Sequence, residues 1–185
     1  MYKYSPEEVK KIAVIGAGTM GPGIAQAFAM GGYIVDVWEP VEKNRELARV
    51  RVRDGVATSV SMGDIAPEEE AAVAGRVRFA DSLKAAVEDA QLIVECIVEK
   101  VDAKISLYTE LAALNKDAII ASNTSALNIF EVVPPELLDR QLLCTGTPRP
   151  SWSRWWRWSR AKARPRSWRT PCWRCCASAA RSRCR

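Results

Sequence analysis

Residues 11–39 read KIAVIGAGTMGPGIAQAFAMGGYIVDVWE, and this stretch decides the fold. An apolar run at residues 12–15 leads into the glycine-rich sequence GAGTMG at residues 16–21. Apolar residues with helical spacing then continue as far as a pair of glycines, and a second apolar run occupies residues 34–38. The order of strand, glycine turn, helix and strand predicts a βαβ unit, in which the two strands are parallel.

A glycine turn in this position, between a strand and a helix, is typical of dinucleotide binding. Gly16 is expected to make the tight turn, Gly18 to let a pyrophosphate approach the backbone, and Gly21 to let the helix pack on the strand. The helix N-terminus adds free N–H groups and the positive end of its dipole, which both attract phosphate. The candidate cofactor-binding residues of this loop are Gly16, Ala17, Gly18, Thr19, Met20 and Gly21.

Glu39 directly follows the second apolar run and is the candidate ligand of an adenosine ribose. A carboxylate there can accept both ribose hydroxyls and would repel a 2′-phosphate, so the sequence predicts NAD rather than NADP. Lys43 and Arg45 are the nearby cations that could accept a 2′-phosphate instead. A tight turn without a ligand and a solvated acid at the end of a strand are the alternative interpretations of these residues.

Charge is distributed unevenly along the 185 residues. Residues 1–150 contain 16 Lys and Arg and all 22 Asp and Glu, a net charge of −6, whereas residues 151–185 contain 11 basic residues and no acidic residue. The first segment has the composition of one globular domain, of a size that buries about two-thirds of the surface of its unfolded chain. It contains no run of roughly 18 apolar residues and no N-terminal signal region. We therefore expect a cytoplasmic protein without a membrane segment, with Cys96 and Cys144 in its core.

Helical and strand patterns alternate after Glu39. This alternation predicts an α/β fold of the Rossmann type, a doubly wound parallel sheet with right-handed crossovers. Ligands of such a sheet bind at the carboxyl ends of the strands, so the turns after Ile15, Val98 and Ala121 are the ones that matter for function. We expect helices at 41–62, 64–74, 83–89 and 101–113, and strands at 77–79, 92–98, 118–121 and from 142.

Polar residues follow two of these strands. Glu99 and Lys104 come after the apolar run at 92–98, and Ser122, Asn123, Thr124 and Ser125 come after the next one. Their spacing alone indicates a solvated helix start and a cluster of turn or helix-capping residues.

Three motifs in order give these residues a more specific meaning. The glycine loop, the segment LIVECIVEK at 92–100 followed by Lys104, and the run ASNTSAL at 121–127 together resemble the NAD-binding domain of the 3-hydroxyacyl-CoA dehydrogenases of fatty-acid β-oxidation. The resemblance covers residues 11–145. It implies that the loop glycines hold the pyrophosphate and Glu39 the ribose, while Glu99 and Lys104 line the nicotinamide side. It also implies that Ser125 contacts both the cofactor and the 3-oxygen of an acyl-CoA substrate, as a catalytic hydrogen-bond donor.

The resemblance also shows what is missing. Oxidation of a secondary alcohol needs a base that titrates near neutrality, and in the family this base is a histidine oriented by a glutamate. The chain contains no histidine, and spacing assigns the position of the base to Gly146. Neither Cys144 nor a lysine is a natural substitute at neutral pH. The resemblance implies NAD-dependent oxidation of an L-3-hydroxyacyl-CoA to the 3-oxoacyl-CoA, and we expect the 185-residue chain itself to be inactive. Because the missing motif would have fixed the substrate, a related hydroxy-acid or carnitine dehydrogenase is the alternative.

Residues 151–185 contain only Arg, Lys, Trp, Ser, Ala, Cys, Pro and Thr, including six of the seven Trp residues. Without aliphatic periodicity this segment cannot continue the sheet, and we expect it to be disordered or loosely packed. Arg interleaved with Trp is compatible with sequence-independent nucleic-acid binding or with adsorption to an anionic membrane. Cys172 and Cys175 have the spacing of two zinc ligands, but no second pair accompanies them. We expect no specific nucleic acid, membrane or metal as a partner.

A shift of reading frame explains this composition more simply. Trp has the single codon TGG, so a frame that starts one base earlier converts every Trp to Leu, Val or Met. With GC-rich codons, residues 151–159 then read Leu-Met-Glu-Pro-Val-Val-Glu-Val-Val, and the family has Leu-Met-x-x-Val-Glu-Val-Val just after its histidine. We therefore expect an NAD-binding domain at 1–145 and a wrong-frame or disordered tail at 146–185. The C-terminal helical domain through which family members usually form homodimers would be absent, and a catalytically inactive NAD-binding module with a basic tail is the alternative.

Overall fold

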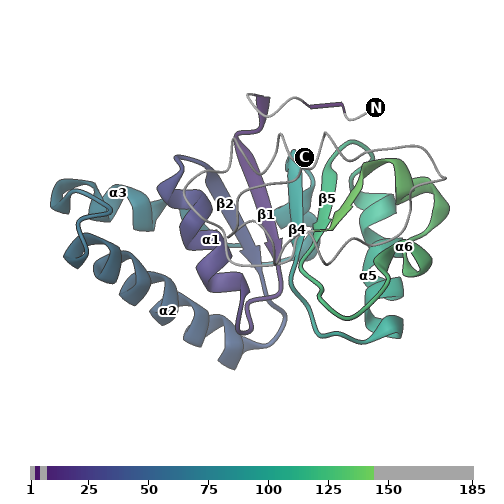
Figure 1. Ribbon diagram of the computed structural model, residues 1–185, viewed down its shortest axis with the longest axis horizontal. Coiled ribbons are helices and arrows are strands. Elements are labelled where there is room, and N and C mark those ends of the chain that lie inside the picture. Colours follow the sequence, from purple (N-terminus) through teal and green to yellow (C-terminus); the bar gives the residue numbers. More distant parts are fainter. Residues whose placement is uncertain (1–2, 5–7, 144–185) are drawn as a thin grey trace, which may run out of the picture.

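The computed structural model describes residues 3–4 and 8–143, which form one sheet between two layers of helices (Figure 1). The strand order is β3-β2-β1-β4-β5-β6, and neighbouring strands are parallel throughout. This confirms the expected doubly wound α/β fold of the Rossmann type. The strands are β1 (Lys11–Ile15), β2 (Ile34–Trp38), β3 (Val77–Phe79), β4 (Leu92–Glu95), β5 (Ile119–Ser122) and β6 (Gln141–Leu143). The helices are α1 (Gly21–Met30), α2 (Glu42–Ser61), α3 (Glu70–Gly75), α4 (Leu83–Val87), α5 (Val101–Leu114) and α6 (Ile129–Val132), with 3₁₀ turns at Pro67–Glu69 and Pro135–Arg140.

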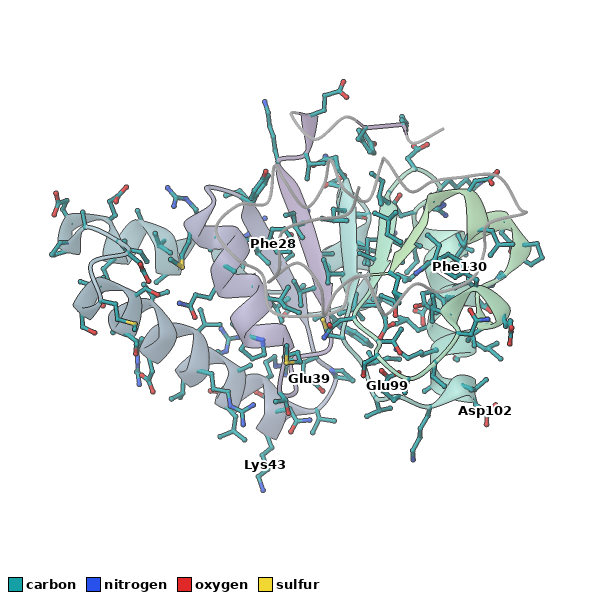
Figure 2. All side chains as sticks on the ribbon, in the orientation of Figure 1. Phe28, Glu39, Lys43, Glu99, Asp102 and Phe130 are labelled. Atoms are coloured by element: carbon teal, nitrogen blue, oxygen red, sulfur yellow. The ribbon has the colours of Figure 1, made fainter. Side chains whose placement is uncertain are left out.

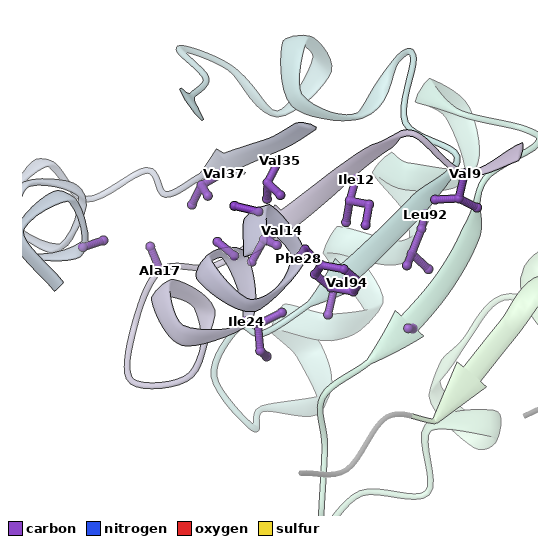
Figure 3. Packing of buried hydrophobic residues seen from close by; sticks show 14 of the residues in the cluster. Val9, Ile12, Val14, Ala17, Ile24, Phe28, Val35, Val37, Leu92 and Val94 are labelled. Carbon is purple, nitrogen blue, oxygen red and sulfur yellow. The ribbon is translucent and has the colours of Figure 1, made fainter. Parts of the chain in front are cut away.

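Alternate side chains of each strand enter opposite layers of the core. Ile12 and Val14 of β1 belong to the layer under α1, α2 and α3, whereas Ala13 and Ile15 belong to the layer under α4, α5 and α6. Figure 3 shows Phe28 of α1 beside the strand residues of the first layer. Because the central strands are buried on both faces, their sequences are apolar runs rather than alternating patterns.

Most predicted elements are confirmed, but two differ, and two observed elements were not predicted. The strand expected at 92–98 ends at Glu95, because the amide of Ile97 turns back to donate to the Glu95 carboxylate. The helix expected at 64–74 begins as the 3₁₀ turn Pro67–Glu69 and becomes α-helical only at Glu70. The short helix α6 and the 3₁₀ turn that follows it were not predicted, since elements of four to six residues are too short to show a helical period. Their buried Ile129 and Leu137 join the second core layer.

Several sequence-based expectations lie outside the described residues. These are the core position of Cys144, the base position at Gly146, the domain boundary after residue 145 and everything inferred for residues 151–185. Cys96 lies just after β4, partly buried and packed against the first core layer. In the part of the chain that the structure describes, no helix has the length and apolar character needed to cross a membrane.

Two glycines bring the start of α1 close to the end of β1. Gly16 has a φ of +95°, and a Cβ on it would lie 2.8 Å from the carbonyl oxygen of Cys96. A Cβ on Gly21 would overlap the carbonyl oxygen of Gly16. Only glycine adopts the first conformation without strain, and only glycine permits the second contact. The turn can therefore stay tight enough for α1 to start directly beside the loop after β4.

Replacing Gly21 with alanine is expected to destabilise the protein by about 1–3 kcal/mol, because the backbone must move to accommodate the extra methyl group. The matched control is Gly23→Ala in the same helix, where a Cβ would meet nothing within 4 Å. This second change should stabilise by about 0.5–1 kcal/mol, since it lowers the backbone entropy of the unfolded chain. Urea unfolding followed by circular dichroism measures both effects. A Gly21 variant as stable as the unaltered chain would contradict the close packing of this turn.

Candidate functional site

Three loops leave the sheet at the carboxyl ends of β1, β4 and β5. Their first backbone hydrogen bonds extend the sheet by one residue: Cys96 N donates to Ile15 O at 2.8 Å, and Asn123 N donates to Glu95 O at 2.7 Å. The loops therefore emerge side by side, at the edge where parallel sheets of this type bind ligands. Figure 2 shows Glu39 and Glu99 together at this edge, on the loops after β2 and β4.

The glycine loop forms an open cradle for a phosphate group. Gly18 is exposed, and a Cβ on it would meet no atom within 4 Å, so the space beside its backbone is free for a ligand. In the described part of the chain no acceptor binds the amides of Gly18, Thr19 and Met20. Arg51 of α2 donates to the Gly18 carbonyl at 2.9 Å and so holds the far side of the loop. Free amides at a helix N-terminus are the donors that a diphosphate requires.

Glu39 is buried beside this loop and is already bonded to it. One carboxylate oxygen accepts from the amide of Ala17 at 2.9 Å, and the other accepts from the amide of Val41 at 3.1 Å. Each oxygen of an ionised carboxylate has a second lone pair, so two acceptor positions remain for ribose hydroxyls. Glu39 thus fixes the loop through its own bonds, and its role as a ribose ligand stays a prediction.

The two cations near Glu39 are not directed at it. Arg45 forms an ion pair with Glu42 one helical turn before it. Lys43 extends from α2 away from Glu39 and from the sheet edge (Figure 2). A ribose bound beside Glu39 would therefore meet its carboxylate. Neither Lys43 nor Arg45 is directed toward the position of a 2′-phosphate.

Glu99 ties the loop after β4 to the loop after β5. Its carboxylate accepts from the Thr124 hydroxyl at 2.8 Å and from the Ser125 amide at 3.2 Å. Thr124 is buried, and Ser125, next to it, is exposed. The structure thus brings together Glu99 and Ser125, which lie 26 residues apart in the sequence, while their contact with a cofactor or substrate stays a prediction.

Lys104 lies behind Glu99, with its side chain completely buried. Its ammonium is 2.7 Å from each carboxylate oxygen of Glu95 and 3.7 Å from Glu99 Oε2. Lys104 is therefore near the predicted nicotinamide side, but its own side chain is fully buried, whereas that of Glu99 is 39% exposed. Whether it lines the cofactor directly stays a prediction.

Sequence reasoning missed the group that holds Lys104. Glu95 is completely buried at the end of β4 and also accepts from the Tyr108 hydroxyl at 2.9 Å and the Ser122 hydroxyl at 2.5 Å. Two signals could have revealed it. A glutamate inside a run buried on both faces needs buried donors, and Lys104 and Tyr108 are spaced by four residues, which places them on one helix face.

The buried position of Tyr108 beside Glu95 changes the pKa of its phenol. Burial, and then the negative charge of Glu95, raise the pKa of its phenol well above the ordinary value. The phenol therefore keeps its proton in neutral and mildly alkaline solution, and it remains a hydrogen-bond donor to Glu95.

Comparison with known proteins identifies close similarities. The family model described as 3-hydroxyacyl-CoA dehydrogenase, NAD binding domain, matches residues 11–136. The 3-hydroxybutyryl-CoA dehydrogenase of Mycobacterium tuberculosis is 34% identical over 128 residues, which are 68% of this chain and 44% of that protein. The L-carnitine dehydrogenase of Nocardiopsis dassonvillei is 35% identical over 130 residues, which are 69% of this chain and 38% of that protein.

A solved structure extends the comparison to three dimensions. The 5-formyl-3-hydroxy-2-methylpyridine 4-carboxylic acid 5-dehydrogenase, an NAD⁺-dependent dismutase, superposes with a TM-score of 0.66 at 29% identity. The match covers 77% of this chain and 46% of that protein. The chain thus spans less than half the length of each of these relatives. These similarities confirm the resemblance that the glycine loop and the two later motifs indicate.

Replacing Tyr108 with phenylalanine is expected to change how stability depends on alkaline pH. Because the pKa of Tyr108 is raised on folding, the unfolded chain loses this proton first, near pH 10. The contribution of the phenol to stability is therefore complete below about pH 10 and declines above it, by at most about 1.4 kcal/mol per pH unit. Urea unfolding of both chains from about pH 8 to about pH 11 measures the difference. The advantage of the unaltered chain should shrink above pH 10, and a constant difference would contradict the prediction.

Proposed function

The chain belongs to the 3-hydroxyacyl-CoA dehydrogenase family, and from this premise we propose that it is the cofactor half of an enzyme that oxidises an L-3-hydroxyacyl-CoA to the 3-oxoacyl-CoA. The observation that carries the proposal is the position of two loops at the same edge of the sheet, on either side of the loop after β4. The glycine loop offers free amides beside an open space at Gly18. The loop after β5 offers an exposed serine, Ser125, whose amide is held by Glu99.

Each polar residue of the edge has a task in this proposal. When bound, NAD supplies the hydride acceptor. Gly18 and its neighbours hold the diphosphate, and the free lone pairs of Glu39 accept the ribose hydroxyls. Ser125 donates a hydrogen bond to the 3-oxygen of the substrate, and Glu99 fixes the position of Ser125 through its amide. Lys104, behind Glu99, supplies positive charge on the nicotinamide side.

A second substrate class has support of its own. One of the most similar relatives is an L-carnitine dehydrogenase, at an identity equal within one per cent to that of the 3-hydroxybutyryl-CoA dehydrogenase. We therefore propose an acyl-CoA thioester as the substrate class, with a small hydroxy acid such as carnitine as the second candidate. The described residues include the cofactor edge that both classes would share.

The absence of histidine from the sequence leads to a second part of the proposal. We propose that the 185-residue chain binds NAD but does not turn over substrate, because it has no histidine to take the hydroxyl proton. The basic segment at 151–185 and the division after residue 145 support either a wrong reading frame in that segment or an inactive NAD-binding module with a basic tail. The coding DNA distinguishes these two.

The chain is expected to bind NADH at least about tenfold more tightly than NADPH, because Glu39 would repel the 2′-phosphate. Fluorescence titration with both cofactors measures the ratio. Glu39→Gln should reduce the preference, since it removes the negative charge, whereas Lys43→Ala, which changes a side chain directed away from the site, should leave it unchanged. Equal or tighter binding of NADPH by the unaltered chain would contradict the assignment of Glu39.

The 185-residue chain is expected to form no measurable NADH from a 3-hydroxyacyl-CoA and NAD, because general-base assistance alone contributes about 10²- to 10⁴-fold to the rate.

Resequencing the coding DNA across codons 142–156 should show that a change of one base restores a histidine within a few residues of Gly146. The restored protein should form NADH with 3-hydroxyacyl-CoA or with carnitine. Ser125→Ala should then lower kcat about 10²- to 10³-fold, as expected for a lost donor to the reacting oxygen.

Two results would contradict parts of this proposal. Turnover by the 185-residue chain would mean that a base other than histidine operates. Confirmation of the Trp- and Arg-rich segment in the DNA, without a longer frame beyond it, would favour the NAD-binding module over the dehydrogenase.

A further inference from the structure

Lys104 lies between two carboxylates and is bonded to only one of them. Its ammonium is within 2.7 Å of both oxygens of Glu95, and it stays 3.7 Å from the nearer oxygen of Glu99. Lys104 and Glu95 are completely buried, whereas the Glu99 side chain is 39% exposed. Glu95, the buried carboxylate, therefore binds the Lys104 ammonium. Glu99, the partly exposed carboxylate, accepts its hydrogen bonds from other residues.

Glu95 is built to keep this cation. Besides Lys104 it accepts hydrogen bonds from the Tyr108 hydroxyl of α5, the Ser122 hydroxyl of β5 and the Ile97 amide. A buried charge is tolerated only when donors of this kind compensate for its lost hydration. Since the donors come from a helix, a strand and a loop, the carboxylate has a fixed position, and so has the ammonium that it binds.

Glu99 is hydrogen-bonded to the loop after β5. Its two oxygens accept from the Thr124 hydroxyl and from the Ser125 amide. An ammonium that moved toward Glu99 would draw its carboxylate into the interior, away from Thr124 and Ser125. The position of Lys104 therefore decides whether Glu99 can fasten the segment that carries Ser125.

We propose that Glu95 is a positioning residue that keeps Lys104 in the interior and so leaves Glu99 to fix Ser125 at the cofactor edge. Without the charge of Glu95, the only carboxylate that remains near the buried ammonium in the described part of the chain is Glu99 at 3.7 Å, and the ammonium closes this gap, because a poorly compensated buried charge is costly. Glu99 then releases Thr124 and Ser125. The inference rests on the proposed function only for its effect on cofactor binding, since the effect on the loop belongs to the protein alone.

Hydrogen exchange of the full chain without a cofactor tests the effect on the loop. In Glu95→Gln, amides in residues 123–127 should exchange at least about tenfold faster, as expected when a hydrogen bond to a charged group is lost. Residues 11–15 of β1, which lie outside the contacts of Glu99, should not change by the same factor. Unchanged exchange in residues 123–127 would overturn the inference.

The double variant Glu95→Gln with Lys104→Met separates this role from a general weakening of the core. Removing both members of a buried ion pair is far better tolerated than removing one, so this variant is expected to fold. Exchange in residues 123–127 should return to that of the unaltered chain, because no cation remains to draw Glu99 away from the loop. If exchange stayed fast in the double variant, Lys104 would not be the cause of the loosened loop, and the inference would be overturned.

Cofactor titration tests the consequence for binding. NADH and ADP-ribose share the adenosine and diphosphate, but only NADH has the nicotinamide. Glu95→Gln should weaken NADH about tenfold and leave ADP-ribose within a factor of about two. Asp36→Asn is the matched control, because Asp36 is a buried carboxylate of β2 that is paired with Lys11 and Arg78 instead; this variant should leave the ratio of the two affinities unchanged.

The possible failures are distinguishable. If the unaltered chain binds neither ligand, the proposed function is wrong, and the exchange experiment still decides the role of Glu95 in the loop. If the chain binds both ligands and Glu95→Gln weakens both equally, Glu95 is merely structural and the inference is wrong. If only NADH binding is weakened and exchange accelerates in residues 123–127, the positioning role is supported.

Discussion

Helices cover both faces of the sheet, so the side chains of β1 and β4 have no exposed face on which to place a polar group. Chemistry is therefore confined to the ends of the strands, where the backbone leaves the sheet. Gly16 and Gly21 make this arrangement compact, since their missing side chains allow β1, the loop after β4 and the start of α1 to meet. The cofactor edge is a consequence of this double burial.

Three carboxylates order the loops at the carboxyl ends of the strands. Glu39 binds the amide of Ala17 in the glycine loop, Glu99 binds the amide of Ser125, and Glu95 holds Lys104 beneath both loops after β4 and β5. Glu99 is partly exposed, whereas Glu39 and Glu95 are buried. A carboxylate that accepts backbone N–H groups can order a loop and keep lone pairs for a ligand, so support and binding need not use different residues.

The sequence predicted the fold well because the signals for it are local. The apolar runs, the glycine loop and Glu39 determine each element from residues within one turn or one strand. The network around Glu95 could not be predicted in the same way, because its partners Tyr108 and Ser122 lie 13 and 27 residues away and meet only in the folded chain. The early end of β4 has the same origin, since the strand stops where Glu95 captures the amide of Ile97. A charged residue in an apolar run is the one sequence signal that points to such a network.

In the proposed function, cofactor binding and proton transfer depend on different residues. Among the residues that the structure describes, the hydrogen bonds that order Glu39, Glu95 and Glu99 come from residues between Ala17 and Ser125. None of these bonds requires a histidine or any residue of the basic segment at 151–185. Burial and hydrogen bonds close to the sheet thus stabilise the loops at the carboxyl ends of the strands. A catalytic base would act on loops that these interactions have already ordered. A chain that has lost its base should therefore keep its affinity for NAD, and loss of that affinity would have to originate in the carboxylates and glycines of the edge itself.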